Sequence, residues 1–286
     1  SVIGGGQNNT SSGYFVTIGG GQNNTSIGDR TTIGGGASNT VSTYRGSIAG
    51  GNSNIVTGDG GSVSGGFLNQ NFGQYSSIGA GYQNRISSNY ATISGGYSNR
   101  SVGDCSVIGG GYRNVVSGNT STIGGGLNNT NDGQCGFIGG GLNNFVCGFG
   151  GNVVTGGFSN TLTGANSTLV GGKNNTSSGN YEFIGGGNLN TTSSYFAVIG
   201  GGSSNTISGY CSGILGGYAN IVTGNTSFAI SCQAQVYGDR SVVIGGSGIT
   251  ATENDMVYMP SANIQSTGYL YFGDPNLDGS WRIYIN

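Results

Sequence analysis

Residues 106–120 read SVIGGGYRNVVSGNT, and this fifteen-residue pattern returns along most of the chain. Each copy starts from an aliphatic residue followed by glycines. The spacing is 15 residues throughout, except for a single 16-residue step. The clear copies are centred on Ile3, Ile18, Ile33, Ile48, Val63, Ile78, Ile93, Ile108, Ile123, Ile138, Val154, Leu169, Ile184, Ile199 and Ile214, and two degenerate copies follow near Ala229 and Val243. About seventeen copies of one short unit indicate a solenoid, in which each unit is one coil.

Further positions recur with the aliphatic residue, which we number position 0 of each repeat. Positions 2 and 3 are Gly almost throughout, as in Gly110-Gly111, and position 10 is Gly in most copies. Position 6 is Asn in fifteen successive copies: Asn9, Asn24, Asn39, Asn54, Asn69, Asn84, Asn99, Asn114, Asn129, Asn144, Asn160, Asn175, Asn190, Asn205 and Asn220. Glycine permits positive φ at corners, and Asn bonds readily to neighbouring backbone. We therefore expect the Asn side chains to stack into a ladder.

The composition supports a repetitive β structure and excludes several other classes. Of 286 residues, 64 are Gly, only 6% are charged, two are Pro and none is His. Collagen needs Gly at every third residue, a helical protein would not tolerate so much Gly, and no apolar run is long enough for a membrane helix. We expect an all-β parallel roll with two short strands and two tight turns per coil. At about 4.8 Å per coil, it would be roughly 80 Å long.

Such a roll is too thin to be stable alone if only one aliphatic residue per coil points inward. At about 25 cal/mol per Å² of buried apolar surface, one residue gains little against the entropy of ordering fifteen. A second buried face supplied by oligomerisation is therefore expected.

The repeat resembles the heads of trimeric autotransporter adhesins, and related repeats in phage and large-virus fibre proteins. The resemblance covers residues 1–250 and is carried by the period, the aliphatic-glycine step and the corner glycine, as in Ile108-Gly109-Gly110 and Gly118. The Asn ladder and the third glycine depart from the adhesin heads. The resemblance implies a left-handed parallel β-roll, three copies of which associate about a common axis.

Residues 251–286 differ in kind and form a second predicted segment. Residues 269–273 and 280–285 alternate like strands, and the turn-forming stretch 274–279 between them predicts a β-hairpin. This segment resembles those that follow the shaft in phage and viral fibres. We expect the hairpin segment to be incomplete, and the natural protein to continue beyond Asn286.

An apolar stripe at position 4 is the main candidate contact surface. It runs through seven consecutive coils: Phe67, Tyr82, Tyr97, Tyr112, Leu127, Leu142 and Phe158. A stripe about 30 Å long could pack between subunits or present aromatic faces to a sugar. Of the two, packing between subunits is favoured.

Residues suited to catalysis or metal binding do not converge in the sequence. Without His there is no Ser-His-Asp relay and no His metal ligand. Asp29 and Asp59 share a position two coils apart, about 9.5 Å, but solvated corner carboxylates explain them better than a glycosidase pair. We therefore predict no enzyme activity, no cofactor and no metal. The five cysteines favour free thiols over an interchain bond: Cys105, Cys135, Cys147, Cys211 and Cys232.

The sequence favours a structural fibre or adhesin. We expect a homotrimeric rod on a virion, as a tail or capsid fibre, or on a cell surface, which attaches to a host receptor or glycan. A net charge of −2 argues against nucleic acid as a partner, and no membrane insertion is expected. The alternatives are a glycan-degrading tailspike-type enzyme and a secreted self-assembling extracellular filament. Ice binding is less favoured, because the Thr row begun by Thr10, Thr25 and Thr40 ends at Ile55.

Overall fold

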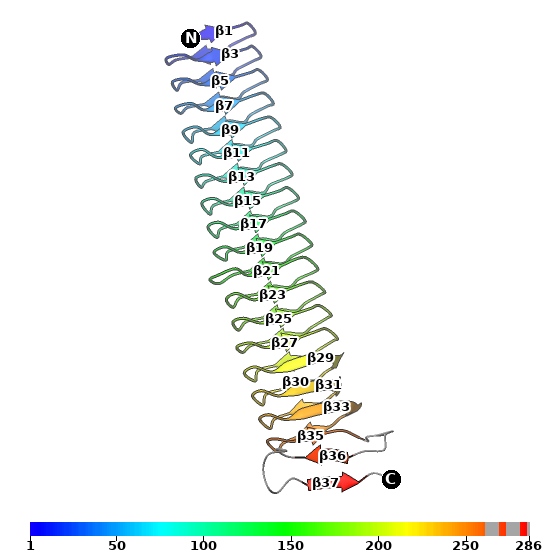
Figure 1. The fold of residues 1–286 in the computed structure, drawn as a ribbon. Helices are drawn as coiled ribbons and strands as arrows, with labels where there is room; N and C mark the ends of the chain where they lie inside the picture. Colours follow the sequence, from blue (N-terminus) through cyan, green and yellow to red (C-terminus); the bar gives the residue numbers. More distant parts are fainter. Residues whose placement is uncertain (261–268, 273–280, 285–286) are drawn as a thin grey trace.

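A computed structural model describes residues 1–260 and two further strands, β36 (Tyr269–Phe272) and β37 (Trp281–Tyr284). The coils stack into a long rod, with β1 at one end and β35 in its last coil (Figure 1). Within the described residues all regular structure is β and no helix occurs. The predicted fold, a parallel β-solenoid of about seventeen coils, is confirmed.

Two parallel sheets run the length of the rod. The first sheet contains β1 (Val2–Ile3), β3 (Thr17–Ile18), β5 (Thr32–Ile33), β7 (Ser47–Ile48), β9 (Ser62–Val63), β11 (Ser77–Ile78), β13 (Thr92–Ile93), β15 (Val107–Ile108), β17 (Thr122–Ile123), β19 (Phe137–Ile138), β21 (Val153–Val154), β23 (Thr168–Leu169), β25 (Phe183–Ile184), β27 (Val198–Ile199), β29 (Gly213–Tyr218), β31 (Phe228–Cys232), β33 (Val242–Ser247) and β35 (Val257–Tyr258). The second sheet contains β2 (Thr10–Ser11), β4 (Thr25–Ser26), β6 (Thr40–Val41), β8 (Ile55–Val56), β10 (Gln70–Asn71), β12 (Arg85–Ile86), β14 (Arg100–Ser101), β16 (Val115–Val116), β18 (Thr130–Asn131), β20 (Phe145–Val146), β22 (Thr161–Leu162), β24 (Thr176–Ser177), β26 (Thr191–Thr192), β28 (Thr206–Ile207), β30 (Ile221–Val222), β32 (Gln235–Val236) and β34 (Thr250–Ala251).

Equivalent residues of successive coils lie side by side, so the sequence period becomes a spatial register. Ile108 pairs with Ile123, one repeat later. The 16-residue step keeps this register, since Ile138 pairs with Val154. The extra residue is absorbed in the corner at 149–151. A slip within a strand would instead have turned every inward side chain outward.

Each coil also contains a third paired row that we did not expect. Position 4 forms a single parallel bridge to the next coil, in an unbroken series from Gln7–Gln22 to Ser203–Tyr218. The corner after this row needs left-handed backbone, as at Arg113 (φ 53°), and so does the corner between the second and first sheets, as at Thr120 (φ 57°). Position 3 needs glycine itself. At Gly111 φ is 90°, and an added Cβ would lie 2.2 Å from the carbonyl oxygen of the next coil.

The core contains two inward rows, so the expectation of one aliphatic residue per coil was wrong. Position 0 is buried from Ile18 onward along the rod, and position 8 is buried opposite it, as at Val41 and Val116. Position 13 compensates for the size of position 8. Beside Val41 it is Gly46, where an added Cβ would lie 2.7 Å from a valine methyl group. Single coils therefore bury more apolar surface than one aliphatic row provides.

At the C-terminal end, β36 and β37 pair in antiparallel register, from Tyr269–Tyr284 to Phe272–Trp281. The predicted turn at 274–279 lies outside the described residues. Parallel pairing of the solenoid itself continues as far as Tyr258, which pairs with Val243.

Candidate functional site

The position-6 asparagines form one column inside the corner between the bridge row and the second sheet. The Asn114 Nδ2 donates to the carbonyl oxygens of Gly110 at 3.0 Å and Gly126 at 2.9 Å, and its Oδ1 accepts from the backbone N–H of Asn129 at 3.0 Å. The asparagines from Asn24 to Asn220 are all buried. Each side chain thus satisfies backbone groups at a corner that has no strand partner to do so.

The aromatic stripe at position 4 is stacked along the rod. Tyr97 lies between Tyr82 at 4.9 Å and Tyr112 at 4.8 Å, measured between ring centroids, with interplanar angles of 13° and 6°. Phe67 extends the stack at 5.3 Å from Tyr82. The inner rings therefore cover each other's faces, and the stack offers ring edges to solvent. The less favoured alternative for this stripe, in which ring faces are presented to a sugar, does not fit the stacked rings. We call Phe67, Tyr82, Tyr97 and Tyr112 the stacked column.

Cations lie over rings of the stripe. The Arg113 guanidinium carbon is 4.9 Å from the centroid of Tyr112, and the Lys173 Nζ is 5.3 Å from that of Phe158. Leu127 is about one-third exposed, at 37%, like its aromatic neighbours in the stripe, whereas Leu142 is half-buried. The stripe is thus a partly solvated row with positive charge on two of its rings.

A second polar ladder occupies position 11, at the opposite corner. Oδ1 of Asn119 accepts from the backbone N–H of Asp104 at 2.9 Å, and Asp104 accepts from that of Asn89 at 2.8 Å. Asp29 accepts from the N–H of Tyr14 at 2.7 Å. Sequence reasoning missed this ladder, although the recurrence of Asn and Asp at position 11 was a visible signal.

Asp59 has the same structural role as Asp29. Its carboxylate accepts from the Thr43 hydroxyl and from the Tyr44 backbone N–H, and these bonds lower the pKa of Asp59. Both residues therefore bond to the corner of the preceding coil, and each is committed to holding successive coils together.

Glu182 is the one buried carboxylate of the described rod, with 2% of its surface exposed. It accepts hydrogen bonds from the hydroxyls of Ser177 at 2.6 Å and Thr192 at 2.8 Å, and from the backbone N–H groups of Gly179 and Ser194, both at 2.8 Å. Four donors from two adjacent coils fill its acceptor sites. Glu182 therefore acts as an internal polar cross-link.

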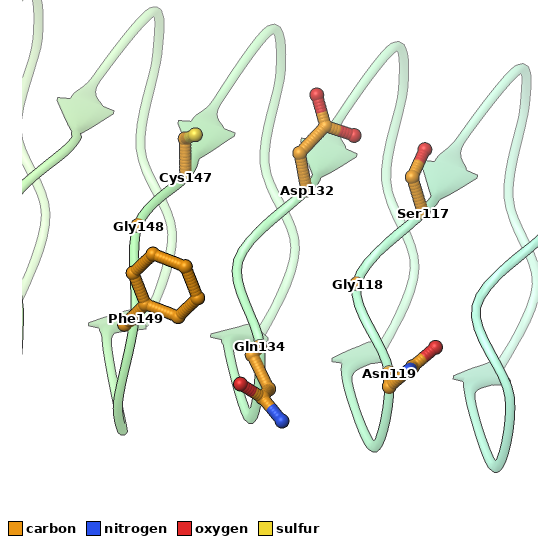
Figure 2. A pocket seen from close by; sticks show the side chains of 8 residues that line it. All are labelled: Ser117, Gly118, Asn119, Asp132, Gln134, Cys147, Gly148 and Phe149. Atoms are coloured by element: carbon orange, nitrogen blue, oxygen red, sulfur yellow. The ribbon is translucent and has the colours of Figure 1, made fainter.

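A shallow depression of about 370 Å³ lies beside the enlarged corner of the 16-residue coil. Figure 2 shows two rows of side chains across it, one at position 9 and one at position 11. Its lining residues are Ser117, Gly118, Asn119, Asp132, Gln134, Cys147, Gly148 and Phe149. Asp132 is its only carboxylate. Within the described residues, no three His, Cys, Asp or Glu side chains lie close enough to hold a metal ion.

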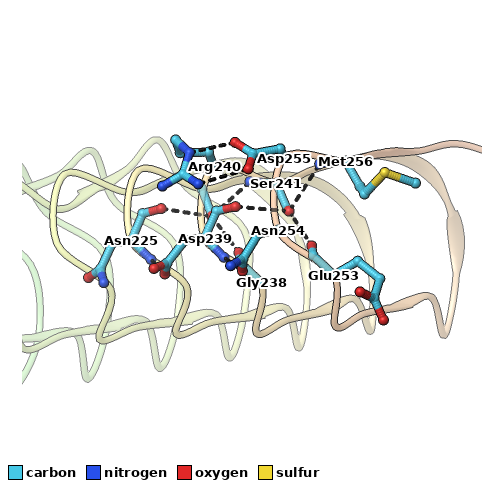
Figure 3. A network of polar contacts seen from close by, with 10 residues as sticks. Asn225, Gly238, Asp239, Arg240, Ser241, Glu253, Asn254, Asp255 and Met256 are labelled. Atoms are coloured by element: carbon cyan, nitrogen blue, oxygen red, sulfur yellow. Dashed lines mark hydrogen bonds and ion pairs between the residues drawn. The ribbon is translucent and has the colours of Figure 1, made fainter.

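The last coils carry a polar network on the position-11 corner (Figure 3). Arg240 makes a two-pronged ion pair with Asp255, in which Nη2 lies 2.8 Å from Oδ2. The guanidinium lowers the pKa of the Asp255 carboxyl. Behind this pair, Asp239 accepts from the Asn225 N–H at 2.7 Å, and Asn254 accepts from the Asp239 N–H at 2.8 Å.

The five cysteines are all free thiols in the described structure. Cys105, Cys135 and Cys211 are exposed at position 12, and Cys147 and Cys232 are half-buried. The described residues also contain no helix long and apolar enough to cross a membrane.

Comparison with known proteins gives no family for the chain. No model of a protein family matches it, and no curated protein is a significant relative. The function is therefore inferred from the side chains that the rod exposes on its surface.

Proposed function

We propose that the chain forms a structural fibre, in which copies associate side by side along the outer face of the first sheet. The observation that carries this proposal is the charge pattern of that face. Positions 14, 1 and 2, which make up its surface, contain no Lys, Arg, Asp or Glu in any coil from Val2 to Met259. All charged side chains of these coils lie at positions 4 to 13.

Apolar side chains on the same face support self-association. Val107, Phe137, Phe183 and Val198 at position 14 remain between 38% and 40% exposed in the single chain. Identical copies in register would bring any charge on this face close to its own kind, so a self-complementary surface must be nearly neutral. The uncharged face is nearly neutral in this sense, so a second copy of the chain can pack against it.

The glycines at position 2 also support a second copy of the chain packed on this face. At Gly125 an added Cβ would meet nothing within 4 Å, whereas at Gly126, position 3, it would lie 2.2 Å from a backbone oxygen. Position 2 is nevertheless Gly in all the clear copies except the one with Ala80. A φ of 149–159° itself favours glycine at Gly5, Gly20, Gly110 and Gly186. At Gly125 no such φ and no contact within the chain excludes a side chain, so the constraint there fits close approach of another subunit.

We take the number of copies to be three, because the repeat resembles trimeric adhesin heads and fibre shafts. In that arrangement the uncharged faces surround the common axis, and the charged positions face solvent. The rod would then project from a virion or cell surface and use its outer side to attach to a receptor or glycan. The rod is proposed to act without catalysis.

Light scattering tests this proposal on the whole chain, and two successive strands offer a matched pair of variants. Thr122 lies at position 14 on the uncharged face, in β17, and Thr130 lies at position 7 of the next repeat, in β18 on the second sheet. We expect a mass of three chains, loss of association in Thr122→Glu, and an unchanged mass in Thr130→Glu. A single-chain mass for the wild type, or an associated Thr122→Glu, would refute the proposed interface. A mass that grows without limit with concentration would refute a closed trimer.

A further inference from the structure

Positive charge is concentrated in one part of the rod. Three successive coils, residues 78–122, contain Arg85, Arg100 and Arg113 against the single acid Asp104, and the nearest acids on either side are Asp59 and Asp132. All three arginines are exposed, and none has an ion-pair partner among the described residues. Asp104 lies at position 11, on the opposite corner of its coil, where its carboxylate accepts a backbone hydrogen bond.

Two of these arginines lie directly side by side on neighbouring strands. Arg85 of β12 and Arg100 of β14 are register partners on the outer side of the second sheet, about 4.8 Å apart along the rod. Like charges in such cross-strand positions repel each other. The Arg85–Arg100 pair is therefore a local electrostatic cost that a bound anion would offset.

Arg85 lies over the Phe72 ring at 5.1 Å, so contact with a ring does not distinguish it from the other stacked arginine pair, whose difference is its neighbouring carboxylates. Arg30 and Arg45 lie at the same position of adjacent coils and pack against the ring of Tyr44, with guanidinium carbons 5.6 and 4.8 Å from its centroid. Asp29 and Asp59 share that corner. The Arg30–Arg45 corner is thus balanced by two carboxylates, whereas the Arg85–Arg100 pair has none.

Arg113 connects the positive region to the stacked column. It occupies position 5 of the coil after Arg100, and its guanidinium lies over Tyr112. The edge of an aromatic ring carries the positive part of its quadrupole, and a phenol hydroxyl can donate. Because the stacked column turns its edges outward, it too favours a negatively charged ligand.

We propose that Arg85, Arg100 and Arg113, together with Tyr97 and Tyr112, bind the carboxylate or sulfate groups of an acidic polysaccharide. This inference rests on the proposed role of the rod in attachment and specifies the ligand. Guanidinium groups bind such oxyanions with two parallel hydrogen bonds, and phenol groups can donate to sugar hydroxyls. A chain with an acidic group on each repeating sugar could follow the rod from coil to coil.

Because the ring faces are covered, the stacked column favours an acidic polysaccharide over a single-stranded nucleic acid or a neutral sugar. Single-stranded nucleic acids bind by stacking their bases on open aromatic faces, and Tyr97 has neither face free. A neutral sugar that packs on a ring face meets the same obstruction. An acidic saccharide needs only the cations and the outward edges, and both are present.

Binding to immobilised polysaccharides tests the inference with the intact chain. The probes are heparin for sulfate, polygalacturonate for carboxylate, dextran as a neutral polymer and oligo(dT) as a nucleic acid. We expect binding to heparin, polygalacturonate or both, and none to dextran. Arg100→Gln and Arg113→Gln should each weaken it about tenfold, the size of one charge-assisted bond. Arg45→Gln removes the same charge elsewhere and should have little effect.

Three results would overturn the inference: no binding to either acidic polymer, equal loss in Arg45→Gln, or equally tight binding to oligo(dT). The mass of each sample, measured in parallel, separates this inference from the proposed assembly. An associated rod that fails to bind refutes only the saccharide site. A single chain that still binds, and loses binding in Arg100→Gln, refutes only the assembly.

Discussion

Replacing Asn114 with Ala removes one rung of the buried ladder and should destabilise its corner severely. The substitution deletes the bonds donated to Gly110 and Gly126 and leaves the buried N–H of Asn129 without an acceptor. A fourth and longer bond, from Asn129 Nδ2 to Asn114 Oδ1 at 3.2 Å, is lost as well. The four lost bonds and the unpaired buried N–H together cost roughly 4–5 kcal/mol. The position-11 residue of the same coil provides a control, because Asn119 is exposed and accepts one bond. Asn119→Ala should cost about 1 kcal/mol or less.

Amide hydrogen exchange measures the effect where it occurs. The N–H of Asn129 should lose protection by at least about a hundredfold in Asn114→Ala, since each 1.4 kcal/mol corresponds to a factor of ten. Urea unfolding of the same samples gives the global loss. If Asn114→Ala and Asn119→Ala lower stability equally, the ladder does not hold the corner, and the recurrence of Asn at position 6 needs another explanation.

Three further predictions concern the core, a corner and the last coils. Val116→Ala at position 8 should lower the unfolding free energy by about 2 kcal/mol in a urea titration, because this side chain is fully buried. Gly126→Ala should cost more than about 1–3 kcal/mol by the same assay, since it combines strained φ with a backbone clash, whereas Gly125→Ala should leave the coil folded and weaken association instead. Because Arg240 lowers the pKa of Asp255, this ion pair stabilises the folded state above the ordinary pKa of about 3.9, and the stabilisation is lost as the pH falls through the lowered value. Carboxyl NMR should therefore give Asp255 a midpoint below its ordinary value, and Arg240→Gln should raise it.

The coils could be predicted from the period, because residues one exact repeat apart in the sequence lie side by side in successive coils. The repeat spacing alone places Ile108 beside Ile123, and the two residues are register partners in the first sheet. The second inward row could not be predicted in this way. Position 8 alternates between aliphatic residues such as Val116 and polar ones such as Asn71 and Ser101, so no uniform hydrophobic signal marks it.

The polar core residues escaped sequence reasoning because those such as Asn71 and Ser101 bond to a partner at another position. Asn71 donates to the carbonyl oxygen of Ser76 at 2.8 Å, and the Ser101 and Ser106 hydroxyls lie 2.6 Å apart. Positions 8 and 13 thus vary together, and either alone resembles a surface position. The sequence predicted only part of the site at the stacked column, for a related reason. Spacing showed that the rings form a row, but their orientation depends on side-chain packing.

Some repeat positions hold the same residue in nearly every coil, and others vary from coil to coil. The two kinds of position have different physical causes, and the difference indicates where the rod binds other molecules. Position 3 is uniform for a reason inside the chain, since Gly126 has no room for a Cβ. Position 2 is almost as uniform, although a positive φ favours glycine only at Gly5, Gly20, Gly110 and Gly186. We attribute the glycines of the other coils, such as Gly125, to a neighbouring subunit. Positions 4, 5 and 7 vary from coil to coil, and a stack of identical coils would multiply any charge placed there into a repelling column. Arginines stacked in register without a balancing carboxylate, as at Arg85 and Arg100, are therefore costly to the rod itself. We attribute their presence to the negatively charged ligand proposed above.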